Sequence, residues 1–308
     1  MKLLKKIASN KWLVKLTQSI QLRTTNAEVG TSAATIAYYL LLSLFPLTIA
    51  IGNILPFFKI DAATVLPYIE TMVPASIFRM LSGTIEDLLS TSNGGLLSIS
   101  AIATVWASSR SINALQISLN KIYDVQGRHN MLIKRLFSFG MIFLFLITIM
   151  LVAVLFSMGQ RILDIVLPMF NLSPDISTWF TTLKWPVTMG SLFLTMSLIY
   201  AVLPNAKVRI RSVVPGALFS TMGWMLLTQF FGLYTDYIAK GLSSYGVIAG
   251  FIIFMLWLDF SAVVIIIGGI INAVIEDMTG DGLIQRKDPI ELSVGKWQSY
   301  KENNKKES

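Results

Sequence analysis

The chain has 308 residues, of which 54% are hydrophobic and only 14% are charged. Because a soluble domain carries roughly 25% charged residues, this composition excludes a globule of this size that folds entirely in water. Cysteine is absent, which excludes disulfides, thiolate metal sites and a cysteine nucleophile, and the net charge of +8 fits the cytoplasmic loops of a membrane protein.

The first segment, residues 1–27, is basic and polar and lacks the apolar core of a cleavable signal peptide. Leu3, Ile7 and Val14 fall on an imperfect apolar stripe. The segment is therefore predicted to be a helix that lies at the cytoplasmic interface and is held there by anionic lipid headgroups.

Six apolar stretches follow, and each has or nearly has the length of a membrane span, about 20 residues. They are residues 31–57, 93–109, 136–160, 185–204, 212–235 and 245–275. Since unpaired backbone groups are costly in lipid, each stretch must form a helix. The sequence thus predicts an all-α polytopic membrane bundle with six transmembrane helices over residues 28–280. Pro46 predicts a kink in the first of them.

Lysine and arginine concentrate in alternate segments between the predicted spans. They are Lys2, Lys5, Lys6, Lys11, Lys15 and Arg23 before the first span; Arg110, Lys121, Arg128, Lys134 and Arg135 after the second; Lys207, Arg209 and Arg211 after the fourth; and Arg286, Lys287, Lys296, Lys301, Lys305 and Lys306 in the polar tail, residues 281–308. By the positive-inside rule, both termini are predicted to lie in the cytoplasm, so the protein is predicted to cross a cell membrane several times.

The outward link, residues 58–92, carries apolar residues at helical spacing on both sides of Pro74. This pattern predicts two short amphipathic helices. One interpretation places them on the surface of the bundle or the membrane. The other interpretation makes them a lid over an outward-facing cavity.

The sequence contains no signature of an enzyme. His129 is the single histidine, which excludes an HExxH zinc motif, and neither a GxxxxGK[ST] phosphate loop nor a GxSxG nucleophile turn occurs. We therefore expect no catalytic site, no metal, no cofactor and no nucleic-acid partner.

Asp259 lies inside the sixth predicted span. A carboxylate in hydrocarbon costs at least about 2.5–3.5 kcal/mol on insertion scales, so Asp259 must face the bundle interior or water. It is either a group that responds to protons or cations on a transport pathway, or the acceptor of a structural hydrogen bond.

A polar stripe is predicted to leave the membrane at the end of the second span. If that helix continues past Arg110, the side chains of Asn113, Asn120 and Tyr123 follow near one face. Asn272, near the cytoplasmic end of the sixth span, extends the stripe. These residues are either candidates for a substrate pathway, or a snorkelling arginine followed by an ordinary solvated face.

Several of these segments resemble the YihY/BrkB family of bacterial membrane proteins. They are AYYLLLSLFP at residues 37–46, WASS at 106–109, LNKIY at 119–123, YG at 245–246, Trp257, and GGIINA at 268–273. The resemblance spans residues 31–273. One departure concerns Ile270, because many members carry glutamate at the matching position, so no role of that acid is carried over.

The resemblance implies a role in envelope integrity, and some members of the family are suspected lipid transporters. The family has also been described as ribonucleases in the past, but these residues offer no nuclease site. We expect a transporter or flippase of an anionic lipid or amphiphile, with membrane lipids as its partners. The alternative is a scaffold that transports nothing and binds envelope proteins. The substrate, the energy source and the oligomeric state stay open.

Overall fold

The computed structural model describes residues 11–55, 63, 66–67, 69–70, 73–90, 94–126, 140, 175–237, 246–279 and 284–285. Its helices are α2 (Lys11–Ala27), α3 (Val29–Ile54), α5 (Ala75–Ser90), α6 (Gly94–Tyr123), α8 (Asp175–Val202), α9 (Ile210–Tyr237) and α10 (Gly246–Thr279). Two short strands, β1 (Ala206–Lys207) and β2 (Ile284–Gln285), pair in antiparallel fashion. The predicted all-α fold class is confirmed.

Three helices of the described part are long and apolar enough to cross a membrane: α3, α9 and α10. They coincide with the first, fifth and sixth predicted spans. The apolar part of α8, Pro186–Val202, is shorter, and α6 covers the second predicted span. The third predicted span, residues 136–160, lies outside the described residues except for residue 140, and so do the tail after residue 285 and much of the 58–92 link. The total of six spans stays a prediction.

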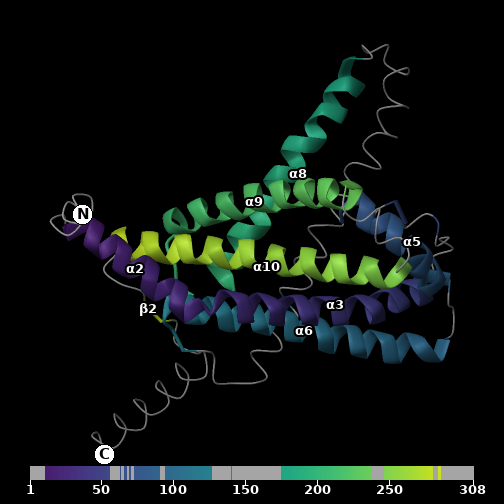
Figure 1. The fold of residues 1–308 in the computed structure, drawn as a ribbon, viewed down its shortest axis with the longest axis horizontal. Coiled ribbons are helices and arrows are strands. Elements are labelled where there is room, and N and C mark those ends of the chain that lie inside the picture. Colours follow the sequence, from purple (N-terminus) through teal and green to yellow (C-terminus); the bar gives the residue numbers. More distant parts are fainter. Residues whose placement is uncertain are drawn as a thin grey trace, which may run out of the picture.

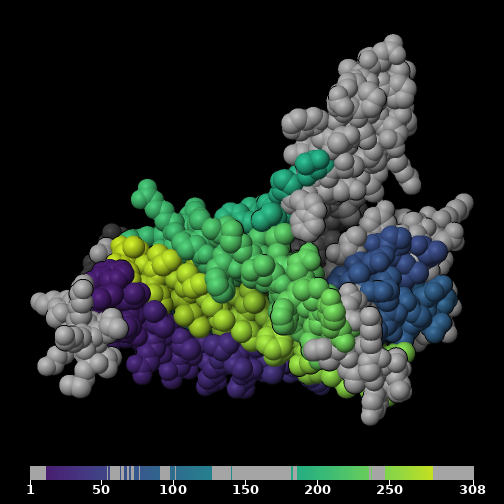
Figure 2. All heavy atoms as spheres, turned by 45° about the horizontal axis from the view of Figure 1, so that its top comes forward, coloured from purple at the N-terminus to yellow at the C-terminus, as the bar shows by residue number. Residues whose placement is uncertain are grey.

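The helices α9, α10, α3 and α6 run side by side, and α8 crosses behind α9 (Figure 1). α2 packs against the last turns of α10 (Figure 2). It also packs against α6. The segments that the charge pattern places in the cytoplasm thus meet at one end, which we call the α2 end. α5 lies at the opposite end, where it packs on α3 and α10.

Two clusters of buried side chains fill the bundle. The cluster toward the α2 end centres on Tyr123, Tyr200 and Ile266, all fully buried. The cluster toward α5 includes Ile77 of α5 and Trp257 of α10. α5 thus packs on the bundle through an apolar face. Both interpretations of the 58–92 link, a surface helix pair and a lid, stay predictions.

Small residues let α8, α9 and α10 approach closely. Gly216 of α9 and Gly268 of α10 face each other so tightly that a Cβ at Gly216 would collide with the Gly268 carbonyl oxygen. The hydroxyl of Tyr200 donates to the carbonyl oxygen of Ile265 at 2.7 Å and lies 2.6 Å from Ser220 Oγ. Close backbone approach and hydroxyl bonds are the interactions that hold helices together without a hydrophobic driving force in lipid.

Candidate functional site

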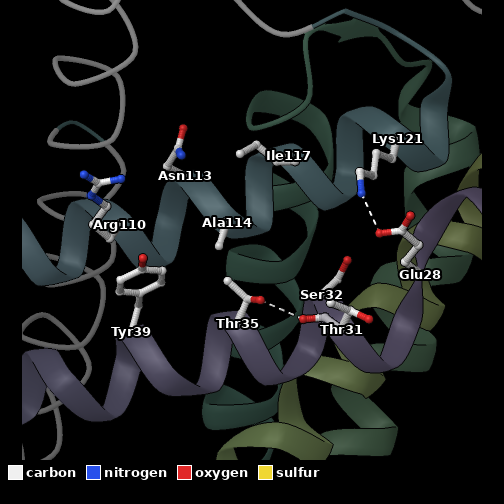
Figure 3. Close-up of a pocket in the computed structure, with 10 residues that line it drawn as sticks. All are labelled: Glu28, Thr31, Ser32, Thr35, Tyr39, Arg110, Asn113, Ala114, Ile117 and Lys121. Carbon is white, nitrogen blue, oxygen red and sulfur yellow. Dashed lines mark hydrogen bonds and ion pairs between the residues drawn. The ribbon is translucent and has the colours of Figure 1, made fainter.

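A polar groove of about 270 Å³ lies between α3 and α6 (Figure 3). We call it the α3–α6 groove. Its lining residues are Glu28, Thr31, Ser32, Thr35, Tyr39, Arg110, Asn113, Ala114, Ile117 and Lys121. Only Ala114 and Ile117 among them are apolar. The groove is therefore a polar track on a bundle whose outward residues are otherwise largely apolar.

Helical spacing explains why these side chains converge. The groove residues of each helix recur at steps of three to four positions, apart from immediate neighbours, so each set forms one stripe along its helix. The two stripes face each other because α3 and α6 pack side by side. Ser111 supports this packing by donating from Oγ to the carbonyl oxygen of Ile36 at 3.4 Å.

The groove offers both hydrogen-bond acceptors and donors. Thr35 and Ser32 donate their hydroxyl protons to backbone carbonyl oxygens at 2.7 and 2.8 Å, so they present lone pairs to the groove. Arg110, Asn113 and Tyr39 make no hydrogen bond to any described residue. Their guanidinium, amide and phenol groups are the donors that remain for a ligand.

Arg110 lies near the middle of α6, sixteen residues after its first residue and thirteen before its last. At 1.5 Å per residue it is roughly 20 Å from the Tyr123 end. The helix thus continues past Arg110, as the predicted polar stripe requires. The guanidinium is exposed, sits 5.4 Å from the centroid of the Trp106 ring, and has no acidic partner among the described residues.

The α2 end of the groove contains an ion pair. Lys121 Nζ donates to Glu28 Oε2 at 2.7 Å, and both side chains are about half exposed. Glu28 is the residue between α2 and α3, and its backbone is in the left-handed region with φ 44° and ψ 54°. The groove therefore carries a cation at each end: Lys121, paired with Glu28, at the α2 end, and Arg110, with no acidic partner among the described residues, at the other.

Asn120 does not line the groove, although it belongs to the predicted stripe. It is buried, and its Oδ1 accepts a hydrogen bond from the backbone N–H of Asn205 at 2.7 Å. Asn205 Nδ2 in turn donates to the carbonyl oxygen of Gln126 at 3.0 Å. These bonds connect the turn after α8 to the end of α6, so Asn120 stabilises the packing of the bundle.

Asn272 is fully buried between α9 and α10 and is not among the residues that line the groove. Its Oδ1 accepts from the backbone N–H of Gly216 at 2.7 Å. Its Nδ2 has no partner among the described residues. The structure therefore brings Arg110 and Asn113 together and leaves Asn120 and Asn272 in helix contacts.

Asp259 lies in α10, on neither helix of the groove. Its Oδ1 is buried and has no hydrogen-bond partner within the described part of the chain. It is thus separate from Arg110 and Asn113. Its two interpretations, a group that responds to protons or cations and the acceptor of a structural hydrogen bond, both stay predictions.

A buried ion pair at the α2 end was not recognised in the sequence as a structural element. Arg23 donates from Nη2 and Nε to the two carboxylate oxygens of Asp277 at 2.8 and 3.0 Å. Its Nη1 donates to the carbonyl oxygen of Ile122 at 2.7 Å, and Ser19 Oγ donates to Asp277 at 2.6 Å. We call these four residues the Arg23 clamp. It joins α2, α6 and α10.

The sequence signal for this clamp is weak. Arg23 was one of many basic residues that set the predicted orientation, and Asp277 follows the sixth predicted span. The neighbouring Glu276 is buried and lies 3.7 Å from Arg209 Nε, measured from its Oε1. The pattern that could have predicted it is two adjacent acidic residues after an apolar span, with arginines in two other segments that are predicted to be cytoplasmic.

Comparisons with known proteins identify the family of this chain. A family model described as virulence factor BrkB matches residues 20–290. Over 253 residues the chain is 33% identical to the ribonuclease-like protein YfkH of Bacillus subtilis (strain 168), covering 82% of this chain and 92% of that one. No solved structure matches.

More distant relatives are named UPF0761 membrane proteins. One, from Xanthomonas campestris pv. campestris (strain B100), is 24% identical over 246 residues, and one from Xanthomonas oryzae pv. oryzae (strain PXO99A) is 24% identical over 245. The match covers 77% of this chain, and the chain spans 55% of each of these relatives.

Proposed function

Because the chain belongs to the virulence factor BrkB family and is a multi-pass membrane protein, we propose that it moves an anionic lipid or amphiphile across the membrane. The α3–α6 groove is the path of the headgroup in this proposal. The tails stay in the bilayer beside the groove, next to the exposed apolar side chains of α6. These include Ile99, Ile102, Val105 and Ile117.

The observation that carries the proposal is the position of Arg110. A guanidinium on an outward helix face, roughly 20 Å from the helix end, costs several kcal/mol in hydrocarbon unless water or an anion accompanies it. The planar guanidinium of Arg110 can donate two parallel hydrogen bonds to one phosphate group. The amide of Asn113 and the phenol of Tyr39 line the same groove and supply further donors.

The charge of the groove favours an anion over a cation. Arg110 and Lys121 oppose the single acid Glu28, so the lining carries one net positive charge. A headgroup with one phosphate would neutralise it. A zwitterionic headgroup carries a cation as well as its phosphate, so its electrostatic attraction to the groove is weaker. This difference predicts selectivity for anionic lipids.

We do not extend the ribonuclease-like name of the Bacillus relative to this chain. Among the described residues, no three side chains of His, Cys, Asp or Glu are grouped so that they could hold a metal ion. The part-buried Asp277 and the buried Glu276 face arginines in helix contacts.

Substituting Arg110 with glutamine should slow transport of an anionic lipid about tenfold, because a hydrogen bond to a charged group contributes roughly 1.5–3 kcal/mol. The measurement uses vesicles with reconstituted protein and a fluorescent phosphatidylglycerol, read by a membrane-impermeant quencher. Transport of fluorescent phosphatidylcholine should change less.

The matched control is Arg211→Gln, which removes the same charge from an exposed position of α9 outside the groove. It should transport like the unmodified protein. Equal rates for Arg110→Gln and Arg211→Gln would contradict the role of the groove. No acceleration by folded, unmodified protein with any lipid tested would favour the scaffold alternative with envelope proteins as partners.

A further inference from the structure

The α2 end of the groove is closed by a glutamate in a strained backbone conformation. Glu28 has φ 44° and ψ 54°, which lies in the left-handed region that residues other than glycine and asparagine rarely occupy. Its carboxylate lies 2.7 Å from Lys121 Nζ inside the groove lining. A strained residue whose side chain sits at a candidate site suggests that the side chain has a task there.

The backbone on both sides of Glu28 is fixed by other contacts. On the α2 side, Arg23 anchors the helix to Asp277 through two hydrogen bonds. On the α3 side, the N–H of Ser32 donates to the carbonyl oxygen of Glu28 at 2.9 Å, and Ser32 Oγ donates to that of Ala27 at 2.8 Å. The scaffold therefore presents the Glu28 carboxylate to Lys121.

The ion pair itself is weak and easily exchanged. The side chains of Glu28 and Lys121 are 57% and 42% exposed, and ion pairs between exposed groups contribute little to stability. An ammonium group has three donors, and Glu28 engages one of them with a single oxygen. A side-chain rotation of Glu28, with no change of backbone, is enough to release Lys121 to another anion.

Lys121 is distinct from Arg110 as a point of contact. The two residues are eleven positions apart on α6, or roughly 16 Å along the helix. A single phosphate cannot touch both. The groove therefore has two cationic positions, one at the end where Glu28 lies and one near the middle of the helix.

We propose that Lys121 forms an entry subsite for a phosphate group, and that Glu28 is an intramolecular competitor that occupies this subsite when no ligand is bound. The inference rests on the proposed function of the groove and adds its regulation. The phosphate of an incoming headgroup displaces the Glu28 carboxylate, binds Lys121, and then moves on toward Arg110. Removing the competitor strengthens binding at the entry.

The test measures binding of dansyl-labelled phosphatidylglycerol to the full chain in phosphatidylcholine nanodiscs, by energy transfer from tryptophan. Glu28→Gln should lower the half-saturating concentration of the labelled lipid about threefold, the effect expected for loss of one exposed competing charge. Lys121→Gln should raise it by a similar factor. In the double variant, the gain from Glu28→Gln should disappear, because Lys121 is then absent.

A second arm separates a lipid headgroup from a soluble phosphate. Glycerol phosphate is added to the buffer as a competitor of the labelled lipid. Displacement that is stronger in Glu28→Gln than in the unmodified chain supports a phosphate subsite open to both sources. Lack of displacement together with a threefold gain in lipid binding supports a subsite for the lipid alone.

Three results would overturn the inference. One is that Glu28→Gln binds the lipid like the unmodified chain while Arg110→Gln binds it more weakly. The groove would then still bind the lipid, but Glu28 would not compete with it. Another is a gain that persists in the double variant, which would mean general repulsion by Glu28. The third is no saturable binding in the unmodified chain or in any variant, which would remove the proposed function itself. Glu28→Gly, which also relieves the backbone strain, should bind like Glu28→Gln.

Discussion

Gly216→Ala is expected to lower the free energy of unfolding by about 3 kcal/mol, at the upper part of the range for overpacked cores. A Cβ at this position collides with the carbonyl oxygen of Gly268 and with the Asn272 side chain. The first of these is backbone, so no rotamer change relieves the contact, and α9 must move away from α10. That movement also breaks the hydrogen bond from the Gly216 N–H to Asn272, which is 2.7 Å long.

Gly232→Ala is the matched control for this prediction. It lies in the same helix, and a Cβ there meets no atom within 4 Å. Because alanine favours the helix by about 1 kcal/mol over glycine, this variant should be as stable as the unmodified chain or slightly more so. The measurement is the fraction of monodisperse protein that survives a temperature series in detergent. Equal losses for both variants would show that the contact between α9 and α10 is looser than described.

Arg23→Met should destabilise the protein by about 3–5 kcal/mol, the cost of removing one partner from a buried ion pair. The side chain of Arg23 is 8% exposed and that of Asp277 is 18% exposed. Without the guanidinium, the Asp277 carboxylate keeps only the hydroxyl of Ser19, and the Ile122 carbonyl oxygen loses its donor. α2 should then detach from α10, which limited proteolysis between α2 and α3 would detect.

Two comparisons sharpen this prediction. Lys121→Met breaks an ion pair of similar length on the surface, and such a pair contributes at most about 1 kcal/mol, so the melting temperature should change little. The double variant Arg23→Met with Asp277→Leu should recover much of the loss, because no unpaired carboxylate remains buried. A double variant no more stable than Arg23→Met alone would instead assign the loss to the contacts that Arg23 makes with α6.

The helical framework was largely predictable from hydropathy. Long apolar stretches define α3, α9 and α10, because in lipid the backbone N–H and C=O groups must form their hydrogen bonds within each helix. The same reasoning does not fix where the helix of the second predicted span ends. Hydropathy reports where a helix can meet lipid, whereas the helix itself continues through polar residues to Tyr123, since its backbone hydrogen bonds do not depend on side-chain polarity.

The candidate site was only partly predictable. Spacing along one helix placed Arg110 and Asn113 on a common stripe, because a helical period acts within one segment. The facing residues Thr35 and Tyr39 could not be assigned to the site from the sequence, since their place depends on how α3 lies against α6. The same holds for Glu28, whose role depends on the junction between two helices.

The sequence by itself determined that this protein folds in a lipid bilayer and that it is helical. It also determined that lysine and arginine concentrate in the predicted cytoplasmic segments. Composition and periodicity are sufficient for these conclusions because they act locally along the chain. Only the tertiary structure decided which polar side chains share a surface and which ones hold helices together. Asn113 and Asn120 are the same residue type on one helix, yet one lines the groove and the other accepts from the Asn205 backbone. The partner on a neighbouring helix makes that difference, and a partner distant in sequence is set by packing alone.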